Sequence, residues 1–335
     1  MRAAQIEKPG AITVDQAPDP APGIGEVLVA VEACGVCGTD LHIADGEFEP
    51  TPYPIIPGHE FSGTVVELGS GVHTDLAVGA RVAVDPSLFC GHCAPCRAGR
   101  GNLCANWGAT GDTVDGAFAE RVAVPAANAY LLPESMSFEQ GALVEPLSCA
   151  VHGMRRLGVE VGESVLVVGA GTMGLLLISL LERAGANVVG VDRVPRKVEL
   201  AKRMGAAHGA TSIDELGGER FDAVVDVTGV PQVIEQALSS VRRGGRFLVF
   251  GVAPAEATVA MSPFRIYNDE ITVVGSMAVL HSYGAALDLI ADGTVPTGEL
   301  VSHRLPLSAF PDALDVVREG SGVKVHVLPS LEGAS

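Results

Sequence analysis

The stretch that decides the fold is residues 163–193, ESVLVVGAGTMGLLLISLLERAGANVVGVDR. It opens with an apolar, β-branched run at residues 165–168, turns through GAGTMG at residues 169–174, and continues with a helical pattern. A second apolar run, residues 188–191, ends at Asp192. A glycine triplet alone is a weak signal, but strand, glycine turn, helix, strand and terminal acid together match the dinucleotide-binding fingerprint. The alternative is an ordinary glycine-rich turn that binds no ligand.

Each glycine of this turn has its own physical role in such a fingerprint. Gly169 permits the tight turn, Gly171 lets the backbone approach a pyrophosphate, and Gly174 lets the helix pack closely on the strand. The helix that begins near Thr172 and Met173 directs its positive N-terminal end at the anion. We therefore expect these residues to contact a bound dinucleotide.

The acid after the second strand bears on the choice of coenzyme. Asp192 would accept hydrogen bonds from the adenosine ribose hydroxyls and would repel a 2′-phosphate, so NAD is favoured over NADP. Arg193 is the discordant residue, because a guanidinium could pair with a 2′-phosphate. NADP therefore stays open as the alternative coenzyme.

Further apolar runs at residues 223–227, 246–250 and 271–275 predict more strands, separated by helical stretches and by glycine turns such as residues 243–246. This alternation predicts an α/β fold with a parallel, doubly wound sheet. A dinucleotide lies across the carboxyl ends of such strands. The segments that follow two of these strands supply further candidate contacts: Thr228, Gly229, Gly251 and Val252.

Length, composition and charge narrow the class of protein. A chain of 335 residues exceeds the usual size of one domain, so we expect two. Its net charge of −18 disfavours nucleic acid and anionic membranes as partners. Residues 1–15 lack the apolar core of a signal peptide, and the most apolar later run, residues 175–181, is too short to span a bilayer. We expect a cytoplasmic protein.

A cluster of thiols within residues 90–104, CGHCAPCRAGRGNLC, predicts a structural zinc site. Short Cys-x₂-Cys spacings let one loop fold four thiolates around a tetrahedral ion, and four protein ligands leave no open coordination position. The alternative is a pair of disulfides or four unrelated thiols. The expected ligands are Cys90, Cys93, Cys96 and Cys104.

A second candidate metal site is formed by CGVCGTDLH at residues 34–42 and PGHEFSG at residues 57–63. The Cys-x-x-Cys spacing of the first segment is also found in redox disulfides and in structural zinc sites. A catalytic zinc uses about three protein ligands and keeps one exchangeable position, so Cys37 and His59 are natural candidates and a third ligand is needed. Taken singly, such a histidine is more often just hydrogen-bonded.

These motifs, together with GALVEPLSCAVHG at residues 141–153, resemble the zinc-dependent medium-chain dehydrogenase/reductase family in order and spacing. EPLSCAVHG is similar to the polyol dehydrogenase branch, which includes sorbitol, butanediol and arabinitol dehydrogenases. The resemblance implies a GroES-like β-rich catalytic domain at residues 1–146, with the structural zinc lobe at about 88–106. It also implies a Rossmann NAD-binding domain at 147–278 and a return to the catalytic domain at 279–335.

The resemblance assigns Cys37 and His59 as catalytic zinc ligands, whereas Cys34 falls where the family needs none. Glu60 and Glu145 compete for the remaining protein position, directly or through a water. The other matched positions are a carboxylate that orients the zinc-bound imidazole, Asp40; a proton relay, Thr39 and His42; a contact to the adenosine ribose, Lys197; and a backbone segment beside the nicotinamide, Ser276, Met277 and Ala278.

The implied reaction is the zinc- and NAD-dependent, reversible oxidation of a secondary alcohol in a polyol or vicinal diol to a ketone. Gly38 and the Ala-Val pair at residues 278–279 depart from the residues of some relatives, the latter from an Arg-Tyr pair of sorbitol dehydrogenase, so sorbitol itself is doubtful. The alternatives are an NADP-dependent or phosphorylated-polyol enzyme, a zinc-free quinone or enoyl reductase, and an inactive dinucleotide sensor. We also expect a homo-oligomer, a dimer or a tetramer.

Overall fold

The computed structural model describes residues 1–48, 50–73 and 75–331, which divide into two compact units. Unit 1 comprises Met1–Pro146, Val279–Gly293 and Thr297–Ser335, and unit 2 comprises Leu147–Ala278 and Thr294–Pro296. The segment Thr294–Pro296 therefore groups with unit 2, whereas the sequence analysis placed the whole of residues 279–335 in the first domain.

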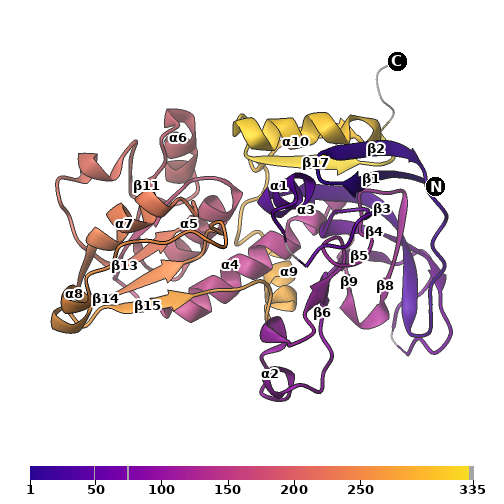
Figure 1. Ribbon diagram of the computed structural model, residues 1–335, viewed down its shortest axis with the longest axis horizontal. Coiled ribbons are helices and arrows are strands. Elements are labelled where there is room, and N and C mark those ends of the chain that lie inside the picture. The colour runs from indigo at the N-terminus through magenta and orange to yellow at the C-terminus, as the bar shows by residue number, and fades with distance from the viewer. Residues whose placement is uncertain (49, 74, 332–335) are drawn as a thin grey trace. The chain divides into compact units, whose positions relative to one another are not determined.

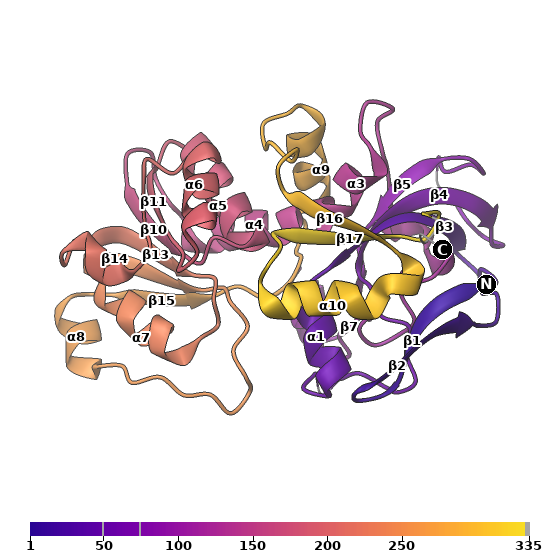
Figure 2. The same ribbon diagram turned by 90° about the horizontal axis from the view of Figure 1, so that it is seen from above.

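Unit 2 is a doubly wound parallel sheet with the strand order β12-β11-β10-β13-β14-β15. In Figure 2, α5 and α6 lie on one face of this sheet and α7 on the other. The order is that of a Rossmann fold, in which the chain leaves the first strand in both directions. The strands are β10 (Ser164–Val168), β11 (Asn187–Val191), β12 (His208–Ala210), β13 (Phe221–Asp226), β14 (Val241–Val249) and β15 (Thr272–Gly275). The helices include α5 (Thr172–Arg183), α6 (Pro195–Arg203), α7 (Pro231–Ser239) and α8 (Pro263–Asn268).

The first strand and helix of unit 2 form as their sequence predicts. Strand β10 is β-branched and buried from its second residue onward, as befits a strand covered on both faces. A Cβ on Gly174 would stand 1.8 Å from the carbonyl oxygen of Gly169, so α5 can approach the turn this closely only with glycine there.

The prediction of a glycine turn at residues 243–246 is wrong, because these residues lie inside β14. The pairing of β14 with β13 shifts register between Phe221 and Ala223, whose partners are Val241 and Arg246. Gly244 has a φ of +73°, a conformation that glycine adopts at little cost. The glycines thus allow a bulge within a longer strand.

Unit 1 is built around a mainly antiparallel sheet with the order β16-β17-β3-β4-β5-β9, and β8 also pairs with β3. Its buried core includes Val29, Phe61, Phe118 and Phe310. The strands are β1 (Arg2–Lys8), β2 (Ala11–Gln16), β3 (Glu26–Val36), β4 (Glu60–Leu68), β5 (Arg81–Val84), β6 (Ser87–Leu88), β7 (Gly108–Ala109), β8 (Arg121–Pro125), β9 (Ala129–Leu131), β16 (Val301–Pro306) and β17 (Lys324–Leu328). The helices include α1 (Gly38–Asp45), α2 (Ala94–Arg97), α3 (Phe138–Ala142), α9 (Tyr283–Ala291) and α10 (Phe310–Glu319), and α4 (Val144–Leu157) begins in unit 1.

The last strand and helix of the chain complete the sheet of unit 1. Strand β17 pairs antiparallel with β3, where Val325 lies opposite Val36, and α10 packs against β17 and α1. Figure 1 shows this C-terminal segment in yellow beside the indigo N-terminal strands. Residues more than 250 positions apart in the sequence are thereby brought to one site. Within the described residues, no helix is long and apolar enough to cross a membrane.

Candidate catalytic and coenzyme sites

Cys37 lies between the end of β3 and the start of α1, where its side chain caps the helix. Its Sγ accepts a hydrogen bond from the N–H of Thr39 at 3.2 Å, and its own N–H donates to Asp40 Oδ2 at 2.8 Å. This reciprocal pair is a capping box, which satisfies two backbone donors that a helix start leaves free. The thiol is therefore fixed in position by the backbone.

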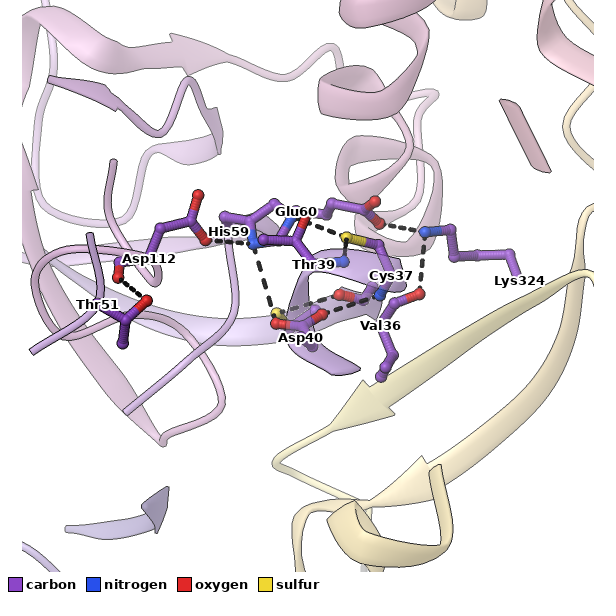
Figure 3. A network of polar contacts seen from close by, with 11 residues as sticks. Val36, Cys37, Thr39, Asp40, Thr51, His59, Glu60, Asp112 and Lys324 are labelled. Carbon is purple, nitrogen blue, oxygen red and sulfur yellow. Dashed lines mark hydrogen bonds and ion pairs between the residues drawn. The ribbon is translucent and has the colours of Figure 1, made fainter. Parts of the chain in front are cut away.

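His59 brings its ring against this thiol. Its Nε2 lies 3.0 Å from Cys37 Sγ, and its Nδ1 lies 3.0 Å from Asp112 Oδ1 and 3.9 Å from Asp40 Oδ1. Figure 3 shows the ring between Cys37 and Asp112. Both carboxylates and the imidazole are buried.

The chemistry of this cluster fits a bound cation. Burial raises the pKa of the Cys37 thiol and raises the pKa of Asp40 to about 7. Burial by itself lowers the pKa of His59, but Cys37, Asp112 and Asp40 outweigh it and raise that pKa well above its usual range. Asp40 Oδ1, His59 Nδ1 and Asp112 Oδ1 make no aligned hydrogen bond with the described residues. Ligand atoms of Cys37, Asp40 and His59 lie within 4.8 Å of one another, and sulfur and imidazole donors suit Zn²⁺.

Glu60 is held by a residue that the sequence analysis missed. Lys324, on β17, donates hydrogen bonds from Nζ to Glu60 Oε2 and, at 3.1 Å, to the carbonyl oxygen of Val36. Burial by itself lowers the pKa of the Lys324 ammonium, but Glu60, Cys37 and Glu145 outweigh it and raise that pKa. Glu60 is outside the group of mutually close ligand atoms. No local motif marks Lys324, because its partner lies 264 residues earlier in the chain.

Glu145 is buried near the start of α4 and lies close enough to Lys324 to contribute to its raised pKa. It too is outside the group formed by Cys37, Asp40 and His59. The structure thus groups two carboxylates, Glu60 and Glu145, around the ammonium of Lys324, and this group lies near the Cys37 thiol.

Thr39 and His42 both lie on α1, three residues apart, so they share one face of that helix. His42 Nδ1 is 2.8 Å from Glu47 Oε2, a partner that the sequence analysis did not name. Both predicted relay residues are partly exposed, in contrast to the buried Asp40 between them.

The four lobe cysteines also converge, around α2 and the turns that flank it. Their sulfur atoms lie within 4.8 Å of one another, with Cys104 Sγ 3.5 Å from Cys90 Sγ and 3.9 Å from Cys93 Sγ. Four sulfurs placed about 2.3 Å from a tetrahedral centre would be about 3.8 Å apart, so the spacing fits zinc. Backbone N–H groups of His92 and Cys93 lower the pKa of Cys90 to about 6, whereas burial raises that of Cys96 to about 12.

Redox pairing of the thiols is not observed. None of the seven cysteines, all of which lie in the described residues, takes part in a disulfide. Cys34 is buried in β3, and its Sγ lies 3.8 Å from the carbonyl oxygen of Gly35. It does not join the group around Cys37, although the two thiols share a Cys-x-x-Cys motif.

Two family models match this chain: the alcohol dehydrogenase GroES-like domain over residues 23–134 and the zinc-binding dehydrogenase over residues 172–292. D-arabinitol dehydrogenase 1 of Uromyces fabae is 37% identical over 98% of this chain and 97% of its own length. The chain belongs to the zinc-dependent medium-chain dehydrogenase/reductase family. Its relatives place it in the polyol dehydrogenase branch, and it is an alcohol dehydrogenase by this membership.

Other members of the family differ in substrate and coenzyme. D-altritol 5-dehydrogenase of Agrobacterium fabrum is 38% identical over 92% of this chain and 93% of that protein. L-threonine 3-dehydrogenase of Xanthomonas euvesicatoria is 35% identical over 94% of this chain and 95% of that protein. A protein of Sinorhizobium meliloti 1021, described as a zinc-binding dehydrogenase and bound to NADP, has a TM-score of 0.91 and 38% identity, covering 98% of this chain and 99% of its own.

In this member of the family, the predicted coenzyme contacts gather at one edge of the unit 2 sheet. Because the strands are parallel, the residues that follow them meet at the carboxyl edge. These residues follow β10 (Gly169, Gly171, Thr172, Met173 and Gly174), β11 (Asp192 and Arg193), β13 (Thr228 and Gly229), β14 (Gly251 and Val252) and β15 (Ser276, Met277 and Ala278). Lys197 lies on α6, which begins three residues after Asp192.

The backbone of this edge leaves room beside the glycine turn. A Cβ on Gly171 would meet no atom within 4 Å, so no protein contact requires glycine there. A Cβ on Gly229 would stand 2.1 Å from the carbonyl oxygen of Val252. Only glycine at this position therefore allows the two neighbouring loops to lie this close together. Open space at Gly171, at the N-terminus of α5, fits the close approach of a pyrophosphate.

Two aspartates hold the loops of this edge. Asp192 accepts hydrogen bonds from the N–H groups of Ala170 and Val194 at 2.8 and 2.9 Å, which joins the glycine turn to the end of β11. Asp226, which the sequence analysis did not name, accepts from the Thr228 hydroxyl at 2.6 Å and from the Gly229 N–H at 3.0 Å. Its position at the end of a buried strand was the available signal.

Proposed function

We propose that this enzyme oxidises a secondary alcohol of a polyol or vicinal diol to a ketone, with NAD as the hydride acceptor, and that the reaction is reversible. The alcohol carbon gives its hydride to the nicotinamide, and the hydroxyl proton leaves to solvent. The observation that carries the proposal is the pair formed by the partly buried Cys37 and the buried His59, with Sγ and Nε2 3.0 Å apart, near the buried carboxylate of Glu145.

Cys37 and His59 would hold a zinc ion together with a carboxylate. When bound, zinc acts as a Lewis acid that makes an alcohol hydroxyl more acidic. The ion pair between Lys324 and Glu60 favours Glu145 as the third protein partner, directly or through a water, because it occupies one oxygen of Glu60. Asp40 and Asp112 would compensate the positive charge from the far side of His59.

Thr39 and His42 would carry the substrate proton towards solvent. Both lie on the first turns of α1, directly after the ligand Cys37, and both are partly exposed. The Glu47 carboxylate at 2.8 Å fixes Nδ1 of His42. This arrangement leaves Nε2 as the nitrogen that exchanges the proton.

The coenzyme preference rests on Asp192. Asp192→Asn should lower the preference for NAD over NADP about tenfold, because it removes the charge that opposes a 2′-phosphate and keeps an oxygen for Ala170. The ratio of kcat/KM with the two coenzymes measures this. Arg193→Ala is the comparison variant and should not lower the preference for NAD, because it removes a guanidinium that could pair with a 2′-phosphate. If the parent uses NADP as well as NAD and Arg193→Ala abolishes that use, then Arg193 decides the preference.

The substrate class is tested by NADH formation across ethanol, butanediol, glycerol, arabinitol, xylitol, sorbitol, a phosphorylated polyol and L-threonine. We expect vicinal diols and polyols to be preferred, since a carboxylate at position 145 can accept a hydrogen bond from a second hydroxyl and ethanol offers none. Ethanol or threonine as the best substrate would contradict the proposal.

Glu145→Ala should lower kcat about 10- to 100-fold with the preferred diol and leave NAD binding nearly unchanged, because the residue supports the metal and not the coenzyme. Glu134→Ala, which removes an exposed carboxylate of the same unit, is the control and should keep full activity. Full activity of Glu145→Ala would exclude it from the site. An inactive parent that binds NAD would instead favour a dinucleotide sensor.

A further inference from the structure

A second carboxylate reaches the imidazole of His59 from a part of the chain with no motif. Asp112 lies between β7 and β8, and its Oδ1 is 3.0 Å from His59 Nδ1. The Oδ1 of Asp40, the carboxylate that the family resemblance assigns to this histidine, is 3.9 Å away. Figure 3 shows Asp112 and Cys37 on opposite sides of the ring.

Glycine contacts in the backbone bring Asp112 to this position. A Cβ on Gly111 would stand 2.3 Å from the carbonyl oxygen of Gly58, and a Cβ on Gly116 would stand 2.4 Å from the same oxygen. Only residues without a side chain allow this approach. Because His59 follows Gly58 and Asp112 follows Gly111, the contact between the glycines places the two side chains together.

Hydrogen bonds fix the Asp112 loop in this place. The hydroxyl of Thr51 donates to the carbonyl oxygen of Asp112 at 2.9 Å, inside the protein. The N–H of Gly116 donates to the carbonyl oxygen of Ile56 at 2.7 Å, and that of Ala117 donates to Gly58 at 2.9 Å. The loop is thus attached to the segment that carries His59, and Asp112 itself is buried.

The carboxylate of Asp40 binds a backbone N–H and not the imidazole of His59. Its Oδ2 accepts the hydrogen bond from the N–H of Cys37 that completes the capping box of α1. Its other oxygen lies beyond hydrogen-bond distance from His59. Asp40 therefore orders the segment that presents the thiol.

We propose that Asp112, and not Asp40, is the positioning residue that orients His59 as a metal ligand. A carboxylate this close to Nδ1 favours the proton on that nitrogen and leaves the lone pair of Nε2, on the Cys37 side, for the metal. The inference rests on the zinc site of the proposed function and is independent of its substrate.

The test measures the affinity of the site for zinc by competition with a chelating indicator, on the full-length protein. Asp112→Asn should weaken the binding of the ion held by Cys37 and His59 about 10- to 100-fold, and should leave the ion held by the four lobe cysteines in place. Asp115→Asn is the matched control, since it removes a charge three residues away and keeps the oxygen that accepts from the N–H of Ile56. It should bind zinc as the parent does.

A second readout follows the geometry of the site in the cobalt-substituted protein. Asp112→Asn should alter the visible absorption of Co²⁺ bound by Cys37, and Asp112→Glu, which restores the charge, should recover part of the zinc affinity. Should Asp112→Asn fail to fold, Asp112→Glu still tests the idea, because a displaced carboxylate should bind zinc measurably more weakly than the parent does. The proposal is overturned if the Asp112 variants match the parent while Asp40→Asn loses 10- to 100-fold. A parent that holds no zinc at Cys37 would instead overturn the proposed function.

Discussion

Cys37→Ser should lose one zinc ion per chain and about 10³-fold or more in kcat/KM with the preferred alcohol. The thiol is fixed by the capping box at the start of α1 and lies 3.0 Å from His59 Nε2, so a hydroxyl in its place removes the soft donor of the cluster. Loss of a Lewis acid that contributes several kcal/mol to the transition state corresponds to a rate effect of this size. Metal analysis and steady-state kinetics measure the two losses.

The matched control is Cys34→Ala, which alters the other thiol of the same Cys-x-x-Cys segment. Cys34 is buried but does not belong to the group of ligand atoms around Cys37, so this variant should keep its full zinc content. If Cys34→Ala lost the metal, or if Cys37→Ser kept both its zinc and an activity within tenfold of the parent, the assignment of the catalytic thiol would be wrong.

Cys93→Ser should lower the stability of the protein more than its catalytic activity. Removing one of four converging thiolates should release the lobe ion, and the melting temperature should fall by on the order of 10 °C, because structural zinc contributes directly to folding free energy. Calorimetry and metal analysis on the purified protein check this. Cys149→Ser, a thiol outside both groups, should keep both ions. A Cys93→Ser protein that melts like the parent with unchanged zinc content would contradict a structural site.

The sequence predicted the Rossmann unit well, for a physical reason. A buried parallel strand needs a continuous apolar run, and a close helix needs glycine, so residues 163–193 carry both signals within one short stretch. β10 and β11 each begin one residue before the predicted apolar run. The prediction for β14 was less accurate, because a glycine bulge and a glycine turn have the same composition.

The metal site was only partly predictable. The lobe cysteines are close in sequence, and their spacing indicates their function. Lys324 and Asp112 are not marked in this way, since each reaches the site through contacts between distant segments: the pairing of β17 with β3, and the approach of Gly111 to Gly58. The resemblance to the family named Asp40 for the histidine, but whether another carboxylate lies closer depends on loop geometry.

The interrupted path of unit 1 also has a consequence for the newly made chain on the ribosome. Residues 147–278 emerge from the ribosome as one continuous segment. The sheet that contains β3, in contrast, is completed only after β17 has been synthesised. From residue 146 to residue 324 are 324 − 146 = 178 residues, which take roughly 10 to 35 s to translate at about 5–20 residues per second. Until then the end of β3 that pairs with β17, residues 34–36, lacks this partner, and open strand edges invite aggregation. Cys37 and His59 are both synthesised early, so the nascent polypeptide would possess these two zinc ligands before it possesses the strand that closes the sheet.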